Sequence, residues 1–290
     1  MRIKFTLKPV SSNKTLPVNY NYFLTSLIYN IIEHSSKDYS RFLHDEGYKL
    51  GQNKKGFKLF TYSMLQGSDA KVGGDRIAFG KGSVRWYLSS PVNDFLQHLI
   101  TGVFAKDQIL KIGSNRLGRS NDLSDFLIER VETLPKPEFN NNMRFTCLSP
   151  ITISITPLPD LNPLHDVNDL SGLNIFRGLN CHYLRPWESG FSDAIKNNLI
   201  KKYKLVYGKD IADADFKVTI DTAYMNKKSG KITKNINFKG TNIIGFMSPF
   251  AVTGSPELIE TGYEAGFGEK GSMGFGMVKF IDSSNSSIRG

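Results

Sequence analysis

The chain has 290 residues, of which 40% are hydrophobic and 12% are aromatic. This apolar content suffices for one large or two ordinary folded domains and excludes an intrinsically disordered chain. Lysine and arginine outnumber aspartate and glutamate by 37 to 27, and the resulting net charge of +10 favours a polyanion as partner. The two cysteines, Cys147 and Cys181, have no companions at metal-ligand spacing, so we expect neither a disulfide framework nor a zinc site.

Residues 1–8 alternate apolar and basic side chains, with Ile3, Phe5 and Leu7 on one face. Alternation with a period of two predicts a strand, and it lacks the continuous apolar core of a signal peptide. No apolar run elsewhere is long enough to cross a membrane. We therefore expect a cytoplasmic protein with no membrane partner.

Residues 19–33 carry apolar side chains at helical spacing and predict an amphipathic helix, with Tyr29 off the apolar stripe. A short second helix is predicted at 36–43, where Ser36 is suited to cap the N-terminus. His44 follows at the end of that helix. The C-terminus of a helix favours the protonated form of a histidine beside it.

A basic loop at 51–56 leads into residues 57–63, which predict a strand that carries Lys58. The remaining elements before residue 135 are strands at 76–80 and 84–89, a helix at 91–104 with Pro91 in its first turn, and a strand at 127–134. The order is β-α-β-β-α-β with one small additional helix. This is the order of a ferredoxin-like domain, which RNA-recognition domains share.

After a linker at 135–142, rich in proline and asparagine, the same order begins again. The predicted elements are a strand at 144–155, a basic helix at 188–207, strands at 216–222 and within 232–251, a helix that starts at Ser255-Pro256, and a last strand at 277–281. We therefore predict an α+β protein of two tandem ferredoxin-like, RRM-like domains. Their expected bounds are 1–138, with the candidate catalytic residues, and 143–283, with a glycine-rich loop.

Lysines gather in two places in the second half of the chain, and they are either RNA contacts or a solvated face. The members on the predicted helix are Lys196, Lys201, Lys202 and Lys204, and those around a predicted turn are Lys227, Lys228, Lys231 and Lys234.

The segment 266–276 reads Gly-Phe-Gly-Glu-Lys-Gly-Ser-Met-Gly-Phe-Gly, with five glycines in eleven residues. Glycine has no Cβ and adopts positive φ, so such a loop can turn tightly and aim backbone N–H groups at an anion. The order Lys-Gly-Ser and the strand that follows exclude a Walker loop or a dinucleotide fingerprint. We predict that the loop holds an RNA backbone; the structural alternative is a glycine-rich hairpin with two aromatic plugs. The RNA-binding candidates are Gly266, Gly268, Lys270, Gly274 and Gly276.

In this combination the chain resembles the CRISPR-associated endoribonucleases of the repeat-associated mysterious protein superfamily, which cut precursor CRISPR RNA within its repeats. The C-terminal signature of that family is Gly-hydrophobic-Gly, five residues with Lys or Arg, and Gly-hydrophobic-Gly, and residues 266–276 match each defined position. Three N-terminal stretches also agree: 27–30 (Leu-Ile-Tyr-Asn), 42–44 (Phe-Leu-His) and 58–63 (Lys-Leu-Phe-Thr-Tyr-Ser). The resemblance covers nearly the whole chain.

The resemblance implies RNA cleavage without a metal or other cofactor, in which a 2′-hydroxyl attacks its own 3′ phosphate. The products would be 5′-hydroxyl and 2′,3′-cyclic phosphate ends. In archaeal-type members a tyrosine, a histidine and a lysine carry out the reaction, and Tyr29, His44 and Lys58 occupy those positions. These residue types suit proton transfer near neutral pH and stabilisation of charge on phosphoryl oxygens. His34, at the end of the preceding helix, is the competing histidine.

Two alternative functions stay open at the level of the sequence. A non-catalytic RNA-binding subunit of a CRISPR effector complex would share the fold and the glycine loop, but it would not need Tyr29, His44 and Lys58. A metal-dependent nuclease is disfavoured because no carboxylate cluster stands out. CRISPR repeat RNA is the expected partner. The sequence leaves open whether the protein forms a homodimer or associates with effector subunits.

Overall fold

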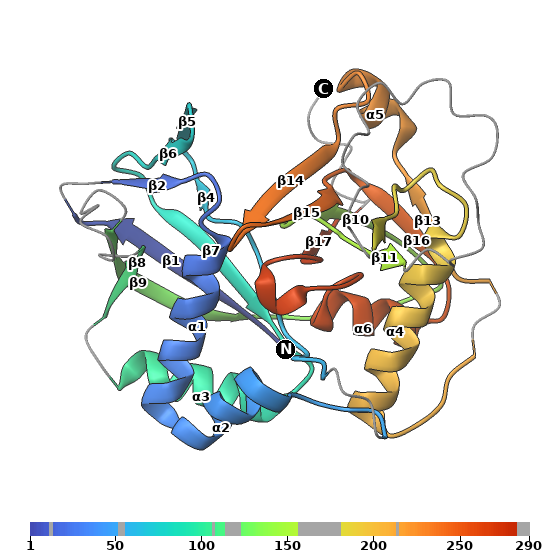
Figure 1. The fold of residues 1–290 in the computed structure, drawn as a ribbon, viewed down its shortest axis with the longest axis horizontal. Helices are drawn as coiled ribbons and strands as arrows, with labels where there is room; N and C mark the ends of the chain where they lie inside the picture. Colours follow the sequence, from blue (N-terminus) through green and yellow to red (C-terminus); the bar gives the residue numbers. More distant parts are fainter. Residues whose placement is uncertain are drawn as a thin grey trace.

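The computed structural model of the protein describes residues 1–11, 14–51, 56–105, 108–113, 123–155, 181–212 and 215–282. These residues form two lobes that lie side by side, each with a β-sheet and helices packed on it (Figure 1). None of the helices among them is both long and apolar enough to span a membrane.

The N-terminal lobe is an antiparallel sheet with the strand order β3-β7-β1-β9-β8, and β4 pairs with β7 at its side. Its first four strands have the ferredoxin-like arrangement. The strands are β1 (Arg2–Pro9), β3 (Thr61–Tyr62), β4 (Gln66–Gly67), β7 (Val84–Ser89), β8 (Ile109–Ile112) and β9 (Ser124–Leu134).

Two helices, α1 (Asn21–Ser35) and α3 (Asn93–Phe104), pack against the core of this lobe. The alternation read from the sequence is the reason for the core: Ile3, Phe5 and Leu7 of β1 are fully buried. Gly102 allows α3 to pass directly against the carbonyl of Ile31 in α1, where a Cβ would collide.

The C-terminal lobe repeats the arrangement with the strand order β13-β16-β10-β17. Two helices, α4 (Phe191–Tyr207) and α6 (Pro256–Ala265), pack against each other and contribute to its core. The sheet strands are β10 (Asn142–Cys147), β13 (Lys217–Ile220), β16 (Phe250–Thr253) and β17 (Val278–Phe280). Tandem ferredoxin-like folds are therefore confirmed, with β9 as the last strand of the first sheet and β10 as the first strand of the second.

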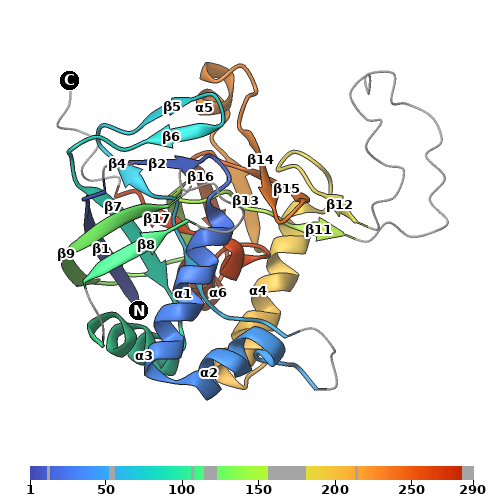
Figure 2. The ribbon, with the colours of Figure 1, turned by 60° about the vertical axis from the view of Figure 1, so that its left-hand side comes forward.

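Three smaller units are added to the two sheets. A hairpin of β14 (Thr233–Phe238) and β15 (Thr241–Phe246) extends from the C-terminal lobe, and short α5 (Thr222–Lys227) precedes it. The pair β11 (Ser154–Ile155) and β12 (His182–Tyr183) lies beside α4 (Figure 2). A separate sheet, β2 (Thr15–Pro17), β6 (Arg76–Ala78) and β5 (Lys71–Gly73), includes the strand predicted at 76–80, which is therefore not part of the main sheet.

Several predicted bounds were wrong for local reasons. The strand expected over 57–63 is limited to β3, because Leu59 has a φ of 52° and interrupts the extended chain. Helix α3 begins at Asn93, so Pro91 lies before the helix and not in its first turn. Short α2 (Lys37–Arg41) is capped as predicted, since the Ser36 hydroxyl accepts from the Tyr39 N–H at 3.2 Å.

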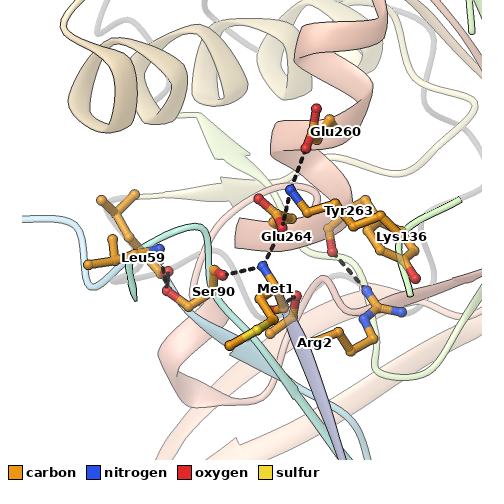
Figure 3. A network of polar contacts seen from close by, with 10 residues as sticks. Met1, Arg2, Leu59, Ser90, Lys136, Glu260, Tyr263 and Glu264 are labelled. Atoms are coloured by element: carbon orange, nitrogen blue, oxygen red, sulfur yellow. Dashed lines mark hydrogen bonds and ion pairs between the residues drawn. The ribbon is translucent and has the colours of Figure 1, made fainter. Parts of the chain in front are cut away.

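The two lobes meet at the start of β1, where Arg2 crosses to the C-terminal lobe (Figure 3). Its guanidinium donates to the carbonyls of Val278 at 2.6 Å and Tyr263 at 2.8 Å and lies 3.7 Å from the centre of the Tyr263 ring. Arg2 is only 3% exposed, and this burial lowers the pKa of its side chain to about 10. Its partners are carbonyls and a ring face, so this contact is a buried polar connection between the lobes.

A second set of polar contacts lies beside Arg2 in the same view (Figure 3). The buried Glu264 carboxylate of α6 pairs with the amino group of Met1 and, at 2.9 Å, with the Lys136 ammonium. The Met1 amino group also donates to the Ser90 carbonyl at 2.9 Å, and the Ser90 hydroxyl donates to the Leu59 carbonyl at 2.8 Å. The contacts therefore run from α6 to the residue that follows Lys58.

The lobes also touch at the tip of the β14–β15 hairpin. The Asn237 N–H donates to the Asn19 side chain at 3.1 Å, and the Tyr22 and Phe238 rings meet edge-on at 5.7 Å. The Lys239 ammonium lies 4.2 Å from the centre of the Tyr22 ring. The hairpin tip is thus a place of contact between the lobes that is separate from the one around Arg2.

Candidate active site

Tyr29 lies on the side of α1 that faces the following turn, off the fully buried stripe, as its helical position predicts. Its ring meets the His44 ring edge-on at 5.7 Å and the Phe60 ring at 6.3 Å. Phe60 in turn stacks on Phe95 of α3 at 4.4 Å. The packed rings hold Tyr29 in place. Burial raises the pKa of its hydroxyl to about 12, so the group stays protonated near neutral pH and can donate a hydrogen bond.

His44 lies in a π-helical turn, Phe42–Glu46, which continues α2 and which the sequence did not predict. The turn closes with a bond of 2.8 Å from the Gly47 N–H to the Phe42 carbonyl. π-Helical turns are rare and occur frequently at functional sites. The His44 side chain is 73% exposed, and its Nδ1 lies 2.7 Å from a carboxylate oxygen of Asp45. This contact orients the ring and leaves Nε2 available.

Lys58 is held against the same turn from the other side. Its ammonium donates to the His44 carbonyl at 2.9 Å. The bridge between Tyr48 and Phe57 fixes the two segments, with N–H to carbonyl distances of 2.8 and 2.7 Å. Gly47 has a φ of 69°, and a Cβ there would lie 2.6 Å from the Phe57 carbonyl, so glycine is required for the close approach.

The pKa of Lys58 is lowered, first by burial, and the nearby Asp45 carboxylate counteracts this effect. Asp45 thus faces both His44 and Lys58. Asp45 was not among the residues predicted from the sequence, although its position directly after His44 was the available signal. The structure brings the three predicted residues Tyr29, His44 and Lys58 together.

Three other histidines of the described residues lie away from Tyr29 and Lys58. His34 is exposed, and its Nδ1 contacts the Asn30 carbonyl within its own helix. His98 is packed: its ring lies on Tyr39 at 4.6 Å and its Nδ1 is 3.0 Å from the Ser35 hydroxyl. His182 contacts Glu188, while His165 falls outside the described residues. His44 is the histidine whose ring contacts the Tyr29 ring.

The glycine-rich loop, residues 266–276, is packed between the lobes. Donors from the N-terminal lobe hold its carbonyls: the Thr61 hydroxyl donates to Phe275 at 2.8 Å and the Thr25 hydroxyl to Ser272 at 3.1 Å. The Asn21 amide lies 3.3 Å from the Met273 carbonyl. The two aromatic residues of the motif, Phe267 and Phe275, are buried, as expected if they act as aromatic plugs of a glycine-rich hairpin.

The glycines of the loop allow these close contacts. Gly266, Gly268, Gly274 and Gly276 have φ between 81° and 86°. A Cβ at Gly274 would lie 2.6 Å from the Asn21 amide, and one at Gly268 would overlap the Thr152 carbonyl. The motif therefore has a structural role within the protein, whatever it binds.

Lys270, the cation of the motif, has a φ of 58° and a half-buried side chain. Its ammonium lies 3.5 Å from the Glu269 carboxylate and 5.5 Å from the centre of the Tyr183 ring. The Glu269 carboxylate also accepts from the Ser154 hydroxyl at 2.8 Å. Lys270 is thus a charge held in place by its neighbours.

A cavity of about 980 Å³ lies between the loop, helix α4 and the segment that carries Lys58. Four lysines line it from three elements: Lys58, Lys201 and Lys202 of α4, and Lys270 of the loop. Asp45 and Glu269 line it as well. The cavity is large enough for a nucleotide, and its cations suit a phosphodiester.

The predicted lysine cluster on α4 divides into two kinds. Lys201 and Lys204 are exposed, whereas Lys202, which also lines the cavity, is only 4% exposed. The sequence signal for this burial was its position on the apolar stripe of the helix.

Two sheets of ferredoxin type, with a glycine-rich loop between them and a Tyr-His-Lys cluster beside a basic cavity, define a class of two-domain α+β proteins whose fold RNA-recognition domains share. Residues 134–280 match the family described as CRISPR associated protein Cas6, C-terminal, and residues 15–118 match CRISPR-associated protein Cas6, N-terminal. The chain belongs to the Cas6 family.

Individual relatives extend over nearly the whole chain. The CRISPR-associated endoribonuclease Cas6 1 of Methanocaldococcus jannaschii is 30% identical, covering 98% of this chain and 94% of its own. The CRISPR-associated endoribonuclease Cas6 of Pyrococcus furiosus is 27% identical, covering 96% and 89%. A solved structure titled "Characterization of a Cas6-related gene from Pyrococcus furiosus" superimposes with a TM-score of 0.75 at 24% identity, covering 98% of this chain and 99% of that one.

Proposed function

We propose that this protein is an endoribonuclease that cuts CRISPR precursor RNA within its repeats, without a metal, using the 2′-hydroxyl of the RNA as nucleophile. The observation that carries the proposal is the convergence of three side chains from separate segments. The Tyr29 ring meets the His44 ring, and the Lys58 ammonium lies on the His44 carbonyl. A protein that only binds RNA would not need this set. Relatives named as endoribonucleases support the same activity.

The RNA would pass through the basic cavity, with the scissile phosphate beside Lys58. Lys201 and Lys270 would contact neighbouring phosphates, because they line the same cavity from other elements. The glycine-rich loop forms the opposite wall through Glu269, Lys270, Gly271, Ser272 and Met273. The other predicted RNA-binding residues, Gly266, Gly268, Gly274 and Gly276, would act by shaping this wall.

In the reaction, the 2′-oxygen attacks the adjacent phosphorus while the bond from phosphorus to the 5′-oxygen of the next nucleotide breaks. One proton leaves the 2′-hydroxyl and one is delivered to the 5′-oxygen, so the products are a 2′,3′-cyclic phosphate and a 5′-hydroxyl. His44 is the proton-transfer group, because its Nδ1 faces Asp45 and its Nε2 is available. Lys58 would stabilise negative charge on the phosphoryl oxygens, and the protonated Tyr29 hydroxyl would donate to them.

One modified substrate tests the mechanism. Repeat RNA with a single 2′-deoxy nucleotide just 5′ of the scissile phosphate should bind but resist cleavage. Loss of one hydroxyl costs only about 1 kcal/mol of binding. Cleavage of the unmodified RNA should proceed in chelator, with a 2′,3′-cyclic phosphate on the 5′ product.

Each rival gives a different result in the same assay. A metal-dependent hydrolase cuts the deoxy RNA and stops in chelator, because water is its nucleophile. A non-catalytic RNA-binding subunit binds both RNAs and cuts neither. Cutting of the deoxy RNA at the normal site would refute the mechanism.

A further inference from the structure

Helix α4 carries a lysine where its apolar stripe requires a hydrophobic residue. Phe191, Ile195 and Leu199 are buried at intervals of four, and Lys202 comes next on the same face. A lysine is almost never fully buried unless its ammonium has partners. Its 4% exposure therefore requires an explanation.

The partners of Lys202 are three carbonyls at the start of the glycine-rich loop. The ammonium lies 3.3 Å from the carbonyl of Ala265, 2.6 Å from that of Gly266 and 2.7 Å from that of Gly268. Ala265 ends helix α6, where carbonyls have no partner within the helix and a cation is favourable. Lys202 therefore caps α6 and holds the loop with one group.

These contacts fix two peptide units of the loop at both of their polar ends. The N–H that follows the Gly266 carbonyl donates to the Gly276 carbonyl at 2.9 Å. The N–H that follows the Gly268 carbonyl, that of Glu269, donates to the Thr152 carbonyl at 2.7 Å. A planar trans peptide points its C=O and N–H in opposite directions, so neither unit can rotate without breaking two bonds. The next residue is Lys270, on the wall of the cavity.

The rest of the loop is held from the other lobe, by Asn21, Thr25 and Thr61. Lys202 is the side chain of the C-terminal lobe that holds the half of the loop leading to Lys270. Its removal would leave that half without its cationic partner while the other half stays attached.

We propose that Lys202 is a positioning residue for RNA binding: it does not contact RNA but sets the shape of the loop segment 266–269 and, through it, the place of Lys270. This proposal rests on the proposed function for its RNA readout, but its structural part can be measured in the free protein. The substrate it serves is the phosphodiester chain that would lie in the cavity.

Because the Lys202 ammonium can lose its proton, the shape of the loop should depend on pH, which would not be expected of a lysine that only fills space. Burial lowers its pKa to about 7, and the Glu269 carboxylate counteracts this effect. An ammonium has three N–H groups for three carbonyls, whereas a neutral amine has two and turns a lone pair toward an acceptor. Other charged groups that face the cavity are Lys201 on its own helix, Lys270 on the loop, and Asp45, Glu46 and Lys58 opposite. On α6, Glu260 and Glu264 are paired with Lys136.

The test compares the wild type with Lys202→Met, which keeps the length and removes the ammonium. The matched control is Lys204→Met, an exposed lysine on the same helix that pairs with Asp210. The probe is a single CRISPR repeat RNA with the 2′-deoxy substitution at the cleavage site, and its Kd is measured between pH 6 and 8.5. We expect Lys202→Met to bind ~10-fold more weakly than the wild type at pH 6, since hydrogen bonds to a charged group are lost.

The wild type should lose affinity as the pH rises through about 7, and Lys202→Met should lack this component. Lys204→Met should keep the wild-type Kd and its pH profile. A folded Lys202→Met protein with wild-type affinity and pH profile would overturn the proposal.

A second measurement requires no RNA and can be made on the wild-type protein alone. In the free wild-type protein, the amide signals of Gly266, Gly268 and Glu269 should shift together in NMR spectra with a midpoint near pH 7. Should Lys202→Met fail to fold, this titration still decides, because amides that do not respond between pH 6 and 8.5 contradict the proposal. Titrating amides in a protein that neither binds nor cuts repeat RNA would refute the proposed function and leave the role of Lys202 in the loop intact.

Discussion

Lys58 of the Tyr-His-Lys cluster and Lys270 of the glycine-rich loop line the same cavity, but the two regions are constructed in opposite ways. The His44 and Asp45 side chains are 73% and 59% exposed, and they lie in a short turn. Phe267, Phe275 and Lys202, by contrast, are at most 4% exposed, and donors from both lobes hold the loop. Substitutions in the cluster should therefore change the rate of reaction, while substitutions in the loop should change the stability and shape of the protein.

The largest effect is expected from His44→Ala, which tests whether the cluster performs chemistry. Loss of a positioned proton-transfer group should reduce single-turnover cleavage of repeat RNA by ~10²–10⁴-fold. The melting temperature and the Kd for RNA should stay near wild-type values, because the side chain is exposed. His34→Ala serves as the control; full loss of cleavage in that variant, with none in His44→Ala, would reassign the histidine.

The next largest effect should come from Gly274→Ala, which tests how tightly the glycine-rich loop is packed. A Cβ there would meet the Asn21 amide at 2.6 Å and the Tyr62 ring at 2.7 Å, so we expect a loss of ~2–4 kcal/mol in unfolding free energy, measured with urea. Gly240→Ala is a matched control, because Gly240 has the same φ of 84° with nothing within 4 Å of the added Cβ.

The control variant should lose only ~1 kcal/mol, the cost of the left-handed backbone alone. Equal losses in the two variants would mean that the crowding around Gly274 has no consequence, and the loop would then be less tightly packed than its contacts indicate.

A smaller effect is expected on the pH dependence of the unfolding free energy, and it arises from the buried Lys202. Its pKa is about 7 in the folded protein and has the ordinary value of 10.5 when unfolded. Between these values the unfolded chain retains a proton that the folded protein has released, so unfolding free energy rises with pH, on the order of 1.4 kcal/mol per unit. This contribution is lost as the pH falls through about 7.

Urea unfolding of the wild type and Lys202→Met at pH 6 to 9 isolates the effect, because other titrating groups are common to both. The wild type should gain stability relative to the variant as the pH rises above 7. A constant difference across this range would show that Lys202 keeps its proton. Burial of the Lys202 ammonium thus lowers the unfolding free energy at acidic pH, although the same charged group binds the carbonyls of the loop.

The smallest effect is expected from Lys270→Ala, where the loop would meet RNA. Removal of one phosphate contact should reduce the slope of log Kd against log salt by roughly one unit, with a modest loss of affinity. Lys71→Ala, at an exposed lysine of β5, is the control of equal charge. An unchanged slope in a folded Lys270→Ala protein would assign the motif to structure alone.

The sequence by itself determined the elements whose pattern is local. The alternation of Ile3, Phe5 and Leu7 produced β1, the helical stripe of 19–33 produced α1, and Ser36 capped α2, because these patterns depend on chain neighbours. Two successive sets of such elements were sufficient to predict tandem ferredoxin-like folds. The Tyr29, His44 and Lys58 assignment came from family resemblance, since each residue alone has an ordinary structural explanation.

Only the tertiary structure decided how the polar groups are paired. Leu59 interrupts the predicted strand, and its carbonyl accepts from Ser90, 31 residues further along the chain. Lys202 was one of four helix lysines in the sequence, and its carbonyl partners lie 63 to 66 residues away. Whether a lysine is solvated or buried depends on acceptors that folding brings to it, because burial of the ammonium is tolerated only where they are present. No local pattern along the chain specifies those acceptors.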